Sequence, residues 1–215
     1  MKHSRVYILE GEPEIILLRG WLRRRRPFEP DPDNAGGGTP RMSKVTSETK
    51  ILAEGTVVVA LTVILKDILP PIYHLPQGGS VSAAGMVPLL WFSLRRGLRS
   101  GLEAGAVYGM VNMALGGYIV DPVQALIDYP IAFAALGLAG MFKKYPLMGV
   151  AVGIFGRFLA HFVSGVWFFW IYAPEGMSPI VYSAVYNGSY LAVEFIISAV
   201  IIYTLVRRRL LQVYL

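Results

Sequence analysis

The 215-residue sequence contains no cysteine, and this absence removes several kinds of chemistry at once. Without cysteine the chain has no disulfide bond, no thiolate nucleophile and no cysteine-ligated metal. Its three histidines, His3, His74 and His161, are too far apart in the sequence to indicate a multi-histidine metal site. A Gly-x-x-x-x-Gly-Lys-Ser/Thr phosphate-binding loop is also missing, so we expect no ATPase activity, and we expect no cofactor.

Charge is the second scarce property. Charged residues make up 16% of the sequence, whereas a typical soluble domain has about a quarter. Residues 1–50 hold ten Lys or Arg and seven Asp or Glu, while residues 51–205 hold only seven of each. The net charge of +6 thus belongs to tails and short loops, and we expect no nucleic-acid partner. With 54% apolar residues and a mean hydropathy of +0.51, the sequence predicts an all-α integral membrane protein within a lipid bilayer.

The sequence divides into three parts. Residues 1–50 are polar, with four consecutive arginines at 23–26, and are expected to form a disordered N-terminal arm. Two explanations for this arm remain open: native translation starts at Met42, or the arm is a cytoplasmic extension. Residues 51–206 are expected to form the membrane domain, and residues 207–215 a basic cytoplasmic tail.

Six apolar segments can be compared with the roughly 20 residues that a helix needs to cross a bilayer. They cover residues 51–70, 81–94, 98–115, 122–142, 147–172 and 181–206. The third segment carries glycines at 101, 105 and 109 on one helix face, which favours close packing inside a bundle. The sequence therefore predicts a bundle of six transmembrane helices.

Basic residues occur in alternate loops. Lys and Arg lie at 95, 96 and 99, at 143 and 144, and at 207–209, whereas 72–80, 116–121 and 173–180 contain none. Cytoplasmic loops carry the excess of Lys and Arg, so both termini are expected to face the cytoplasm. Lys66 and Asp67 are exceptions near the outer end of the first segment, and either pair locally or extend toward the membrane surface.

Asp128 is the most informative ionisable residue within the apolar segments. It lies six residues into the fourth segment, which on a helix corresponds to about 9 Å below the outer surface. His161, Tyr182 and Asn187 are expected in the same outer half of the bundle. A carboxylate beside aromatic rings suits a ligand with a fixed positive charge. Alternatively, Asp128 forms a structural pair with Arg157 or His161, and the residues alone leave both possibilities open.

Aromatic residues gather just after His161. On a regular helix Phe168 lies about 20° and Phe169 about 80° from His161, whereas Trp170 lies on the opposite face. The pattern therefore favours Phe168 or Phe169 as the aromatic neighbour of a ligand. Trp167 and Trp170 equally fit the aromatic belt that forms near the ends of membrane helices.

The apolar segments carry motifs of a known family. The motifs, in order, are Leu75-Pro-Gln-Gly-Gly-Ser-Val-Ser82, Leu94-Arg-Arg-Gly-Leu98, Val123-Gln-Ala-Leu-Ile-Asp-Tyr-Pro130, Leu136-Gly-Leu-Ala-Gly-Met-Phe142, Arg157-Phe-Leu-Ala-His-Phe-Val-Ser-Gly165, Tyr172-Ala-Pro-Glu-Gly-Met-Ser-Pro179 and Tyr182-Ser-Ala-Val-Tyr-Asn-Gly188. From about residue 51 to 206 the chain resembles the ThiT/YuaJ family, the thiamine-specific substrate-binding subunit (S component) of energy-coupling-factor (ECF) vitamin transporters.

This resemblance implies a six-helix bundle that binds thiamine near its outer face. The ligand contacts that it implies fall on Asp128, Tyr129, Tyr118, His161, Tyr182 and Asn187, with Phe169 and the neighbouring Trp170 as aromatic candidates. Two departures affect the expected contacts: the family acid is usually Glu rather than Asp, and some members have Trp at the position of Phe169. Neither departure changes the class of ligand that the resemblance implies.

We therefore expect a multi-pass plasma-membrane protein that is not an enzyme and takes part in thiamine uptake. The resemblance also implies its partners, an energising ECF module made of a coupling membrane protein and two cytoplasmic ATPases. Three alternatives remain. The chain is an S component for another vitamin or for a thiamine precursor, an intramembrane enzyme that uses Asp128 and His161 as acid and base, or a structural membrane subunit.

Overall fold

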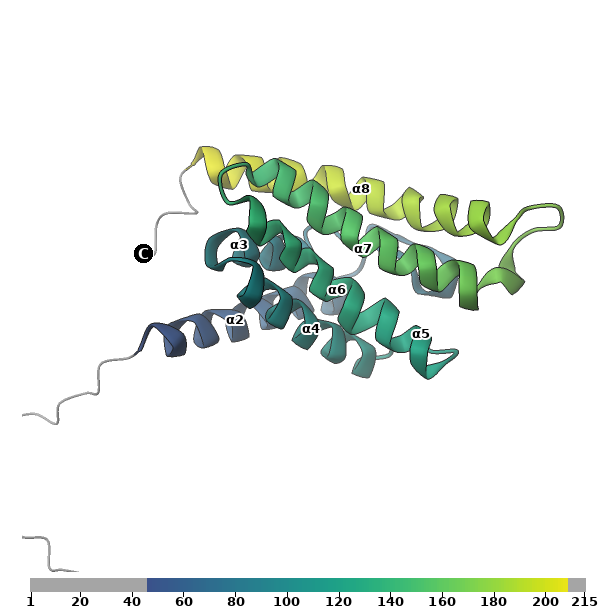
Figure 1. The fold of residues 1–215 in the computed structure, drawn as a ribbon, viewed down its shortest axis with the longest axis horizontal. Coiled ribbons are helices and arrows are strands. Elements are labelled where there is room, and N and C mark those ends of the chain that lie inside the picture. Colours follow the sequence, from purple (N-terminus) through teal and green to yellow (C-terminus); the bar gives the residue numbers. More distant parts are fainter. Residues whose placement is uncertain (1–45, 209–215) are drawn as a thin grey trace, which may run out of the picture. The chain divides into compact units, whose positions relative to one another are not determined.

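The structure is a computed structural model that describes residues 46–208. The expected N-terminal arm before residue 46, with Met42, and the tail beyond residue 208 lie outside the described residues. Within them the chain forms six successive helical segments and one β-hairpin (Figure 1). The segments are α2 (Ser47–Val63) with the π-helical turn η2 (Ile64–Ile68); α3 (Val87–Arg96); α4 (Leu98–Ala114); α5 (Pro122–Leu126), the π-helical turn η4 (Ile127–Ile131), α6 (Ala132–Ala134) and the 3-10 helix η5 (Ala135–Phe142), which follow one another without a break; α7 (Pro146–Phe168) with the 3-10 turn η6 (Trp170–Tyr172); and α8 (Pro179–Arg207).

Three segments differ by four residues or more from the ranges expected from the sequence. The first was expected to begin at residue 51, but α2 already begins at Ser47, within the range expected for the N-terminal arm. The second was expected to begin at residue 81, but Val81 belongs to a strand and α3 begins only at Val87. The fifth was expected to continue to residue 172, but α7 ends at Phe168 because Phe169 leaves the helical conformation, with φ −111° and ψ 11°. In the fifth segment, the residue that leaves the helix, Phe169, lines a cavity instead of extending the helix.

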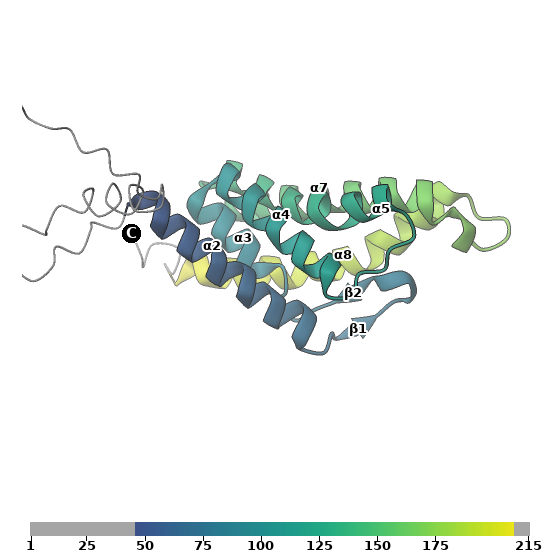
Figure 2. The same cartoon turned by 90° about the horizontal axis from the view of Figure 1, so that it is seen from below.

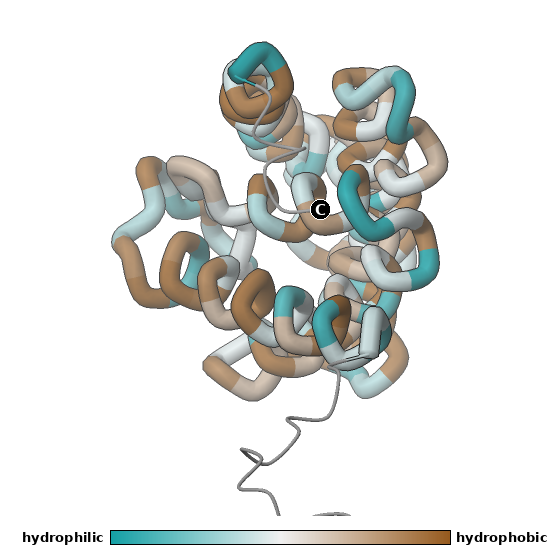
Figure 3. The backbone as a smooth tube through the Cα atoms, turned by 90° about the vertical axis from the view of Figure 1, so that its left-hand side faces the viewer, coloured by the Kyte–Doolittle hydropathy of each residue, from teal (hydrophilic) through white to brown (hydrophobic). Residues whose placement is uncertain are grey.

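The distribution of polar and apolar side chains is that of a protein surrounded by lipid. Three helical stretches between residues 46 and 208 are long and apolar enough to cross a membrane, Pro122–Phe142, Pro146–Phe168 and Pro179–Arg207. Large apolar side chains are exposed along these helices and along α2. In Figure 3, where the tube is coloured by hydropathy, hydrophobic residues (brown) occur all around the bundle. Arg157 and Glu194, by contrast, are buried. A soluble monomer does not expose this much contiguous apolar surface.

Glycines on α4 allow the bundle to close. Gly101, Gly105 and Gly109 face the backbone of the fourth helical segment so closely that a Cβ atom would collide with it at each position. The expected internal packing of this glycine face is therefore confirmed, and it brings η4 directly against α4.

Basic residues gather at one end of the bundle. The start of α2, the turn between α3 and α4, the turn before α7 and the end of α8 all lie at that end, on the left of Figure 1. Glu54 of α2 accepts hydrogen bonds there from Arg95 and Arg96 of α3, and Arg99 pairs with Glu103 at 3.0 Å. The loop between α7 and α8 lies at the opposite end.

A β-hairpin connects α2 to α3 and lies near the end away from the basic residues. Strand β1 (Tyr73–His74) pairs antiparallel with β2 (Ser80–Val81), with Tyr73 opposite Val81. A 3-10 turn, η3 (Pro76–Gly78), joins the strands, and its Gly78 has a φ of +93°, a conformation that glycine adopts readily. Figure 2 shows this hairpin beside the end of α2 and next to α8.

Candidate ligand-binding site

A cavity of about 500 Å³ opens between the hairpin and the ends of the helices that lie away from the basic residues. Its volume falls within the range of roughly 300–1,000 Å³ that is typical of small-molecule sites. Seven of the eight residues expected to contact a ligand line it: Asp128, His161, Tyr182, Asn187, Phe169, Tyr118 and Tyr129. These residues come from three helical segments and one loop, so the fold gathers what the sequence separates by up to 69 positions, from Tyr118 to Asn187.

Asp128 is fixed in position by three hydrogen-bond donors. His161 Nδ1 lies 2.8 Å from its Oδ1, while Gln124 Nε2 and Ser164 Oγ each donate to Oδ2 at 2.7 Å. Gln124 stands one helical turn before Asp128, and the other two donors belong to α7. The carboxylate is therefore held by two helices, and its orientation is set before any ligand arrives.

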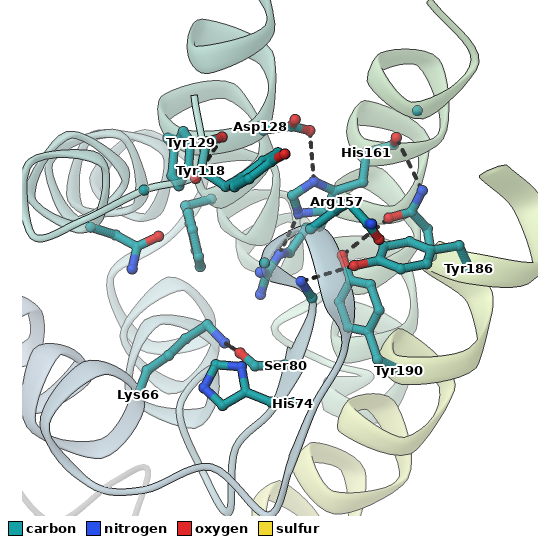
Figure 4. Close-up of a pocket in the computed structure, with 18 of the residues that line it drawn as sticks. Lys66, His74, Ser80, Tyr118, Asp128, Tyr129, Arg157, His161, Tyr186 and Tyr190 are labelled. Carbon is teal, nitrogen blue, oxygen red and sulfur yellow. Dashed lines mark hydrogen bonds and ion pairs between the residues drawn. The ribbon is translucent and has the colours of Figure 1, made fainter. Parts of the chain in front are cut away.

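His161 links this carboxylate to Arg157, as the dashed lines in Figure 4 show. Arg157 Nε donates to His161 Nε2 at 3.2 Å, so Nε2 has to be the acceptor nitrogen of a neutral ring. The ring proton then lies on Nδ1 and points at Asp128. Of the two residues considered as structural partners of Asp128, His161 bonds to it directly, and Arg157 bonds to the other nitrogen of the His161 ring.

A second carboxylate, Asp67, also lines the cavity. Its oxygens accept hydrogen bonds from Tyr108 Oη at 2.9 Å and from Asn112 Nδ2 at 2.7 Å, both on α4. Lys66, its neighbour in the sequence, instead reaches Ser80 Oγ on the hairpin at 3.3 Å. The sequence led us to expect that Lys66 and Asp67 either pair with each other or extend toward the membrane surface. Neither expectation describes the contacts, because each side chain bonds to a different element of the bundle.

Asp67 and Asp128 share an unusual backbone setting. Each belongs to a π-helical turn, η2 and η4, that interrupts an otherwise helical segment beside the cavity. A π-turn inserts an extra residue into the helix and shifts the angular position of everything after it, and such turns are frequent at functional sites. These are the two π-turns of residues 46–208, and both carry an acid to the same cavity.

Helix α8 contributes an amide and three tyrosines. Asn187 Nδ2 donates to the backbone oxygens of His161 at 3.2 Å and Ser183 at 3.0 Å, which joins α8 to α7. Tyr190 donates to Asn187 Oδ1 at 3.2 Å. The rings of Tyr182, Tyr186 and Tyr190 follow one another at helical spacing, with centroids about 6 Å apart, 5.9 and 6.0 Å for the two pairs.

Tyr186 holds the hairpin over the cavity. Its hydroxyl donates to the backbone oxygen of Pro76 and accepts from the backbone N–H of Gly79, the latter at 3.0 Å. Because Pro76 begins η3 and Gly79 directly follows it, a single phenol fixes both ends of the hairpin turn. The loop between α2 and α3 thereby closes one side of the cavity although it contains no tryptophan.

Aromatic side chains form the other rim. Tyr118, in the loop between α4 and α5, shares a hydroxyl–hydroxyl hydrogen bond of 2.8 Å with Tyr172 of η6. This bond raises the pKa of Tyr118 above its ordinary value, so the phenol remains neutral. The Phe169 ring packs beside both tyrosines, with its centroid 6.1 Å from each. These three rings connect the loop after α4 to the loop between α7 and α8.

The structure does not bring Trp170 to the cavity. Trp170 is 57% exposed and Trp167 is 73% exposed, and neither lines the pocket, nor does Phe168. Helix α7 ends before Phe169, so the angles expected for a regular helix no longer apply beyond that point.

The site also contains residues that the sequence reasoning did not assign to it. Lys66, Asp67, Asn112, Gln124, Ser183, Tyr186 and Tyr190 line the cavity as well. Tyr186 and Tyr190 follow Tyr182 at intervals of four, a helical spacing that was available as a signal. No sequence pattern gave the direction of the Lys66 and Asp67 side chains, because it depends on the π-turn.

Comparison with known proteins identifies the family. A sequence model of the family described as "Thiamine transporter protein (Thia_YuaJ)" matches residues 52–213, which is most of the chain. The chain belongs to this family. Family membership makes it a multi-pass protein of the plasma membrane and a transport protein rather than an enzyme.

Individual relatives of the Thia_YuaJ family agree with this assignment. The thiamine transporter ThiT of Bacillus subtilis is 35% identical over 168 residues, which cover 70% of this chain and 87% of the relative. ThiT of Lacticaseibacillus paracasei is 31% identical over 170 residues, covering 68% and 85%. A solved structure of ThiT from Listeria monocytogenes superposes with a TM-score of 0.69 at 27% identity, covering 76% of this chain and 96% of that one.

Proposed function

We propose that this chain is the substrate-binding subunit of a thiamine uptake system and that the cavity holds thiamine. Thiamine joins a permanently cationic thiazolium ring to an aminopyrimidine, so a site for it needs an acid, aromatic faces and hydrogen-bonding groups. The observation that carries the proposal is that Asp128 reaches the cavity together with Phe169, Tyr118 and Asn187. The relatives are thiamine transporters, which supports the same ligand.

Asp128 is suited to balance the charge of the thiazolium ring. Its three hydrogen-bond donors, Gln124, Ser164 and the neutral ring of His161, are all uncharged, so they orient the carboxylate without cancelling its charge. An oriented charge in a water-poor site interacts more strongly with a cation than the same charge in water. Phe169 and Tyr118 supply the aromatic faces that favour a cationic ring.

The polar groups of α8 suit the aminopyrimidine. Asn187 Oδ1 accepts from Tyr190 and has a second lone pair that an amino group can use. Tyr182, which also lines the cavity, is a candidate for a second hydrogen bond or a ring contact from this helix. In this arrangement, the two ends of thiamine meet different helices, with the cation near η4 and the pyrimidine near α8.

Thiamine is proposed to enter from outside the cell. The residues that line the cavity lie away from the turns that carry Arg95, Arg96, Lys143 and Lys144, and an excess of Lys and Arg favours a cytoplasmic location. Since the chain has no cysteine, single cysteines report topology cleanly. In intact cells, Glu175→Cys, in the loop between α7 and α8, should react with a membrane-impermeant maleimide, whereas Lys143→Cys should react only after permeabilisation. The reverse pattern would invert the proposed orientation.

Energy for uptake is proposed to come from an ECF module, a coupling membrane protein with two cytoplasmic ATPases. The Thia_YuaJ assignment and the lack of a phosphate-binding loop in the sequence support this partnership. Cells that express this chain alone should bind thiamine without accumulating it, and adding the module should start accumulation. Accumulation by the chain alone would contradict the need for the module.

Calorimetry tests the ligand directly. The full-length protein, purified in lipid nanodiscs, should bind one thiamine per chain, and its uncharged pyrimidine fragment should bind more weakly because it lacks the thiazolium charge. Absence of heat with thiamine would overturn the proposal. Tighter binding of the pyrimidine than of thiamine would instead make the chain an S component for a precursor.

A further inference from the structure

The tip of the hairpin carries the one non-glycine residue between 46 and 208 that has a positive φ. This residue, Gln77, has a φ of 59° and a ψ of 22°, and Gly78 after it has a φ of +93°. Successive φ values of about +60° and +90° are those of a type I′ turn, whose central positions favour Asn and Gly. Gly78 matches this preference, whereas Gln77 occupies a position at which Asn or Gly is less strained.

Tyrosines from two elements hold this turn in place. The Tyr186 hydroxyl bonds to Pro76 and to Gly79, so it takes the place of the direct hydrogen bond that commonly closes such a turn. A Cβ atom on Gly79 would lie 2.8 Å from the Tyr186 hydroxyl, and a Cβ atom on Gly78 would lie 3.3 Å from Tyr118 Cβ. The backbone on both sides of the strained residue is therefore packed against aromatic side chains, and the surrounding fold maintains its conformation.

Gln77 has unused hydrogen-bonding capacity at the cavity. The residue lines the pocket, and its side-chain amide makes no hydrogen bond with any residue between 46 and 208. An amide offers two N–H donors and a carbonyl acceptor. Residues in sparsely populated backbone conformations persist where the surrounding structure enforces them, and they are frequent where a protein holds a ligand. A strained residue with an unused amide in the cavity wall therefore indicates a contact with the ligand.

We propose that Gln77 is a specificity-determining residue whose amide pairs with the aminopyrimidine of thiamine. This inference rests on the proposed function, because it adds a contact to the same ligand. The aminopyrimidine edge presents an amino donor beside a ring-nitrogen acceptor, and a primary amide matches such an edge with two parallel hydrogen bonds, as Gln does with adenine. The turn is bonded to Tyr186 of α8, the helix assigned to the pyrimidine end of the ligand. Gln77 then recognises the neutral ring while Asp128 balances the cation.

Two substitutions separate the amide from the strain, and calorimetry on the full-length protein in nanodiscs measures their affinities for thiamine and for its uncharged pyrimidine fragment. Gln77→Met keeps an unbranched side chain in the strained position but removes the amide, so it should weaken the binding of both ligands by about tenfold. Gln77→Gly removes the amide and the strain together, so it should weaken binding equally while raising the unfolding midpoint of the ligand-free protein by about 2 °C. Glu175→Met, a change of similar size in the exposed loop between α7 and α8, should alter neither affinity.

The two ligands distinguish the possible failures. Affinities of Gln77→Met within about twofold of the unmodified chain would overturn the amide contact and leave the proposed function intact. A loss for thiamine without an equal loss for the pyrimidine would also overturn it, because the amide would then serve the thiazolium end. A lower unfolding midpoint in Gln77→Gly would contradict the strain at the turn. An unmodified chain that binds neither ligand would overturn the proposed function itself.

Discussion

The two π-turns, η2 and η4, each place an acid beside the cavity, but the surroundings of the two acids differ. Each interrupts a helical segment beside the cavity and carries an acid to it. Both acids accept hydrogen bonds from uncharged donors. Asp67 of η2, however, directly follows Lys66 in the sequence, whereas Asp128 of η4 has no charged neighbour in its turn. The carboxylate of η4 therefore remains a net negative charge available to a ligand, while η2 presents opposite charges side by side.

This difference indicates that the two acids have separate roles. Asp128 joins the fourth helical segment to α7 through Ser164 and through His161, which also lines the cavity. Asp67 joins η2 to α4 and so fixes the end of the first helix. We infer that η4 recognises the cation and that η2 shapes the cavity wall, and the predictions below are ordered by the size of the expected effect.

The largest effect is expected from exchanging the two acids in turn for their amides. Asp128→Asn should weaken thiamine binding by about 100-fold, or roughly 2.7 kcal/mol, because it removes a buried charge that faces the thiazolium. Asp67→Asn, the matched control on the other π-turn, should weaken it by less than about tenfold. Calorimetry on both variants measures this, and a larger loss in Asp67→Asn would reverse the roles assigned to the two turns.

His161→Ala should produce the second largest loss, about 30-fold in thiamine affinity. The change removes the donor that orients Asp128 and leaves Arg157 Nε without its acceptor. The unfolding midpoint in nanodiscs should fall by only a few degrees, because the glycine-packed core is untouched. If the variant unfolds or aggregates instead, the main role of His161 is to stabilise the fold, and the predicted role in orienting Asp128 for the ligand would be wrong.

Tyr186→Phe should have a moderate effect that is mainly kinetic. Loss of the hydroxyl removes two hydrogen bonds to the hairpin turn, so thiamine should dissociate about five times faster from a less firmly closed cavity. Stopped-flow fluorescence measures the rate. Tyr145→Phe, an exposed tyrosine at the basic end, is the control and should not change it. Equal dissociation rates in the unmodified protein, Tyr186→Phe and Tyr145→Phe would show that the hairpin does not retain the ligand.

The smallest effect is expected at Trp170. Trp170→Ala should change thiamine affinity by less than about threefold because the side chain is exposed and lies outside the cavity. Phe169→Ala, one residue earlier, should cost about tenfold through the loss of an aromatic face opposite η4. Equilibrium titration of both variants decides between them, and a larger loss at Trp170 would mean that η6 rearranges when the ligand binds.

Much of the fold and part of the site follow from the sequence. Hydrophobic runs and glycine spacing predicted the six helical segments and the packing of α4. Motif positions indicated residues such as Asp128, His161 and Asn187, which do share one cavity. Their roles in binding remain predictions.

The remaining features depend on backbone geometry that the residue pattern does not predict. A fixed 100° step assumes an unbroken helix, yet α7 ends before Phe169 and two π-turns shift the residues that follow them. The contacts of Lys66 with the hairpin and of Asp67 with α4 are long-range, so they follow from the packing of distant segments. For the same reason, Tyr186 could be placed on a helix but its two bonds to the hairpin could not be foreseen.

The central claim is that Asp128 recognises the positive charge of thiamine. The most direct measurement is calorimetry of thiamine and of its uncharged pyrimidine fragment on the unmodified protein and on Asp128→Asn. The account predicts that the variant loses at least about tenfold more affinity for thiamine than for the pyrimidine, because only thiamine carries the thiazolium. Equal losses for the two ligands would contradict it.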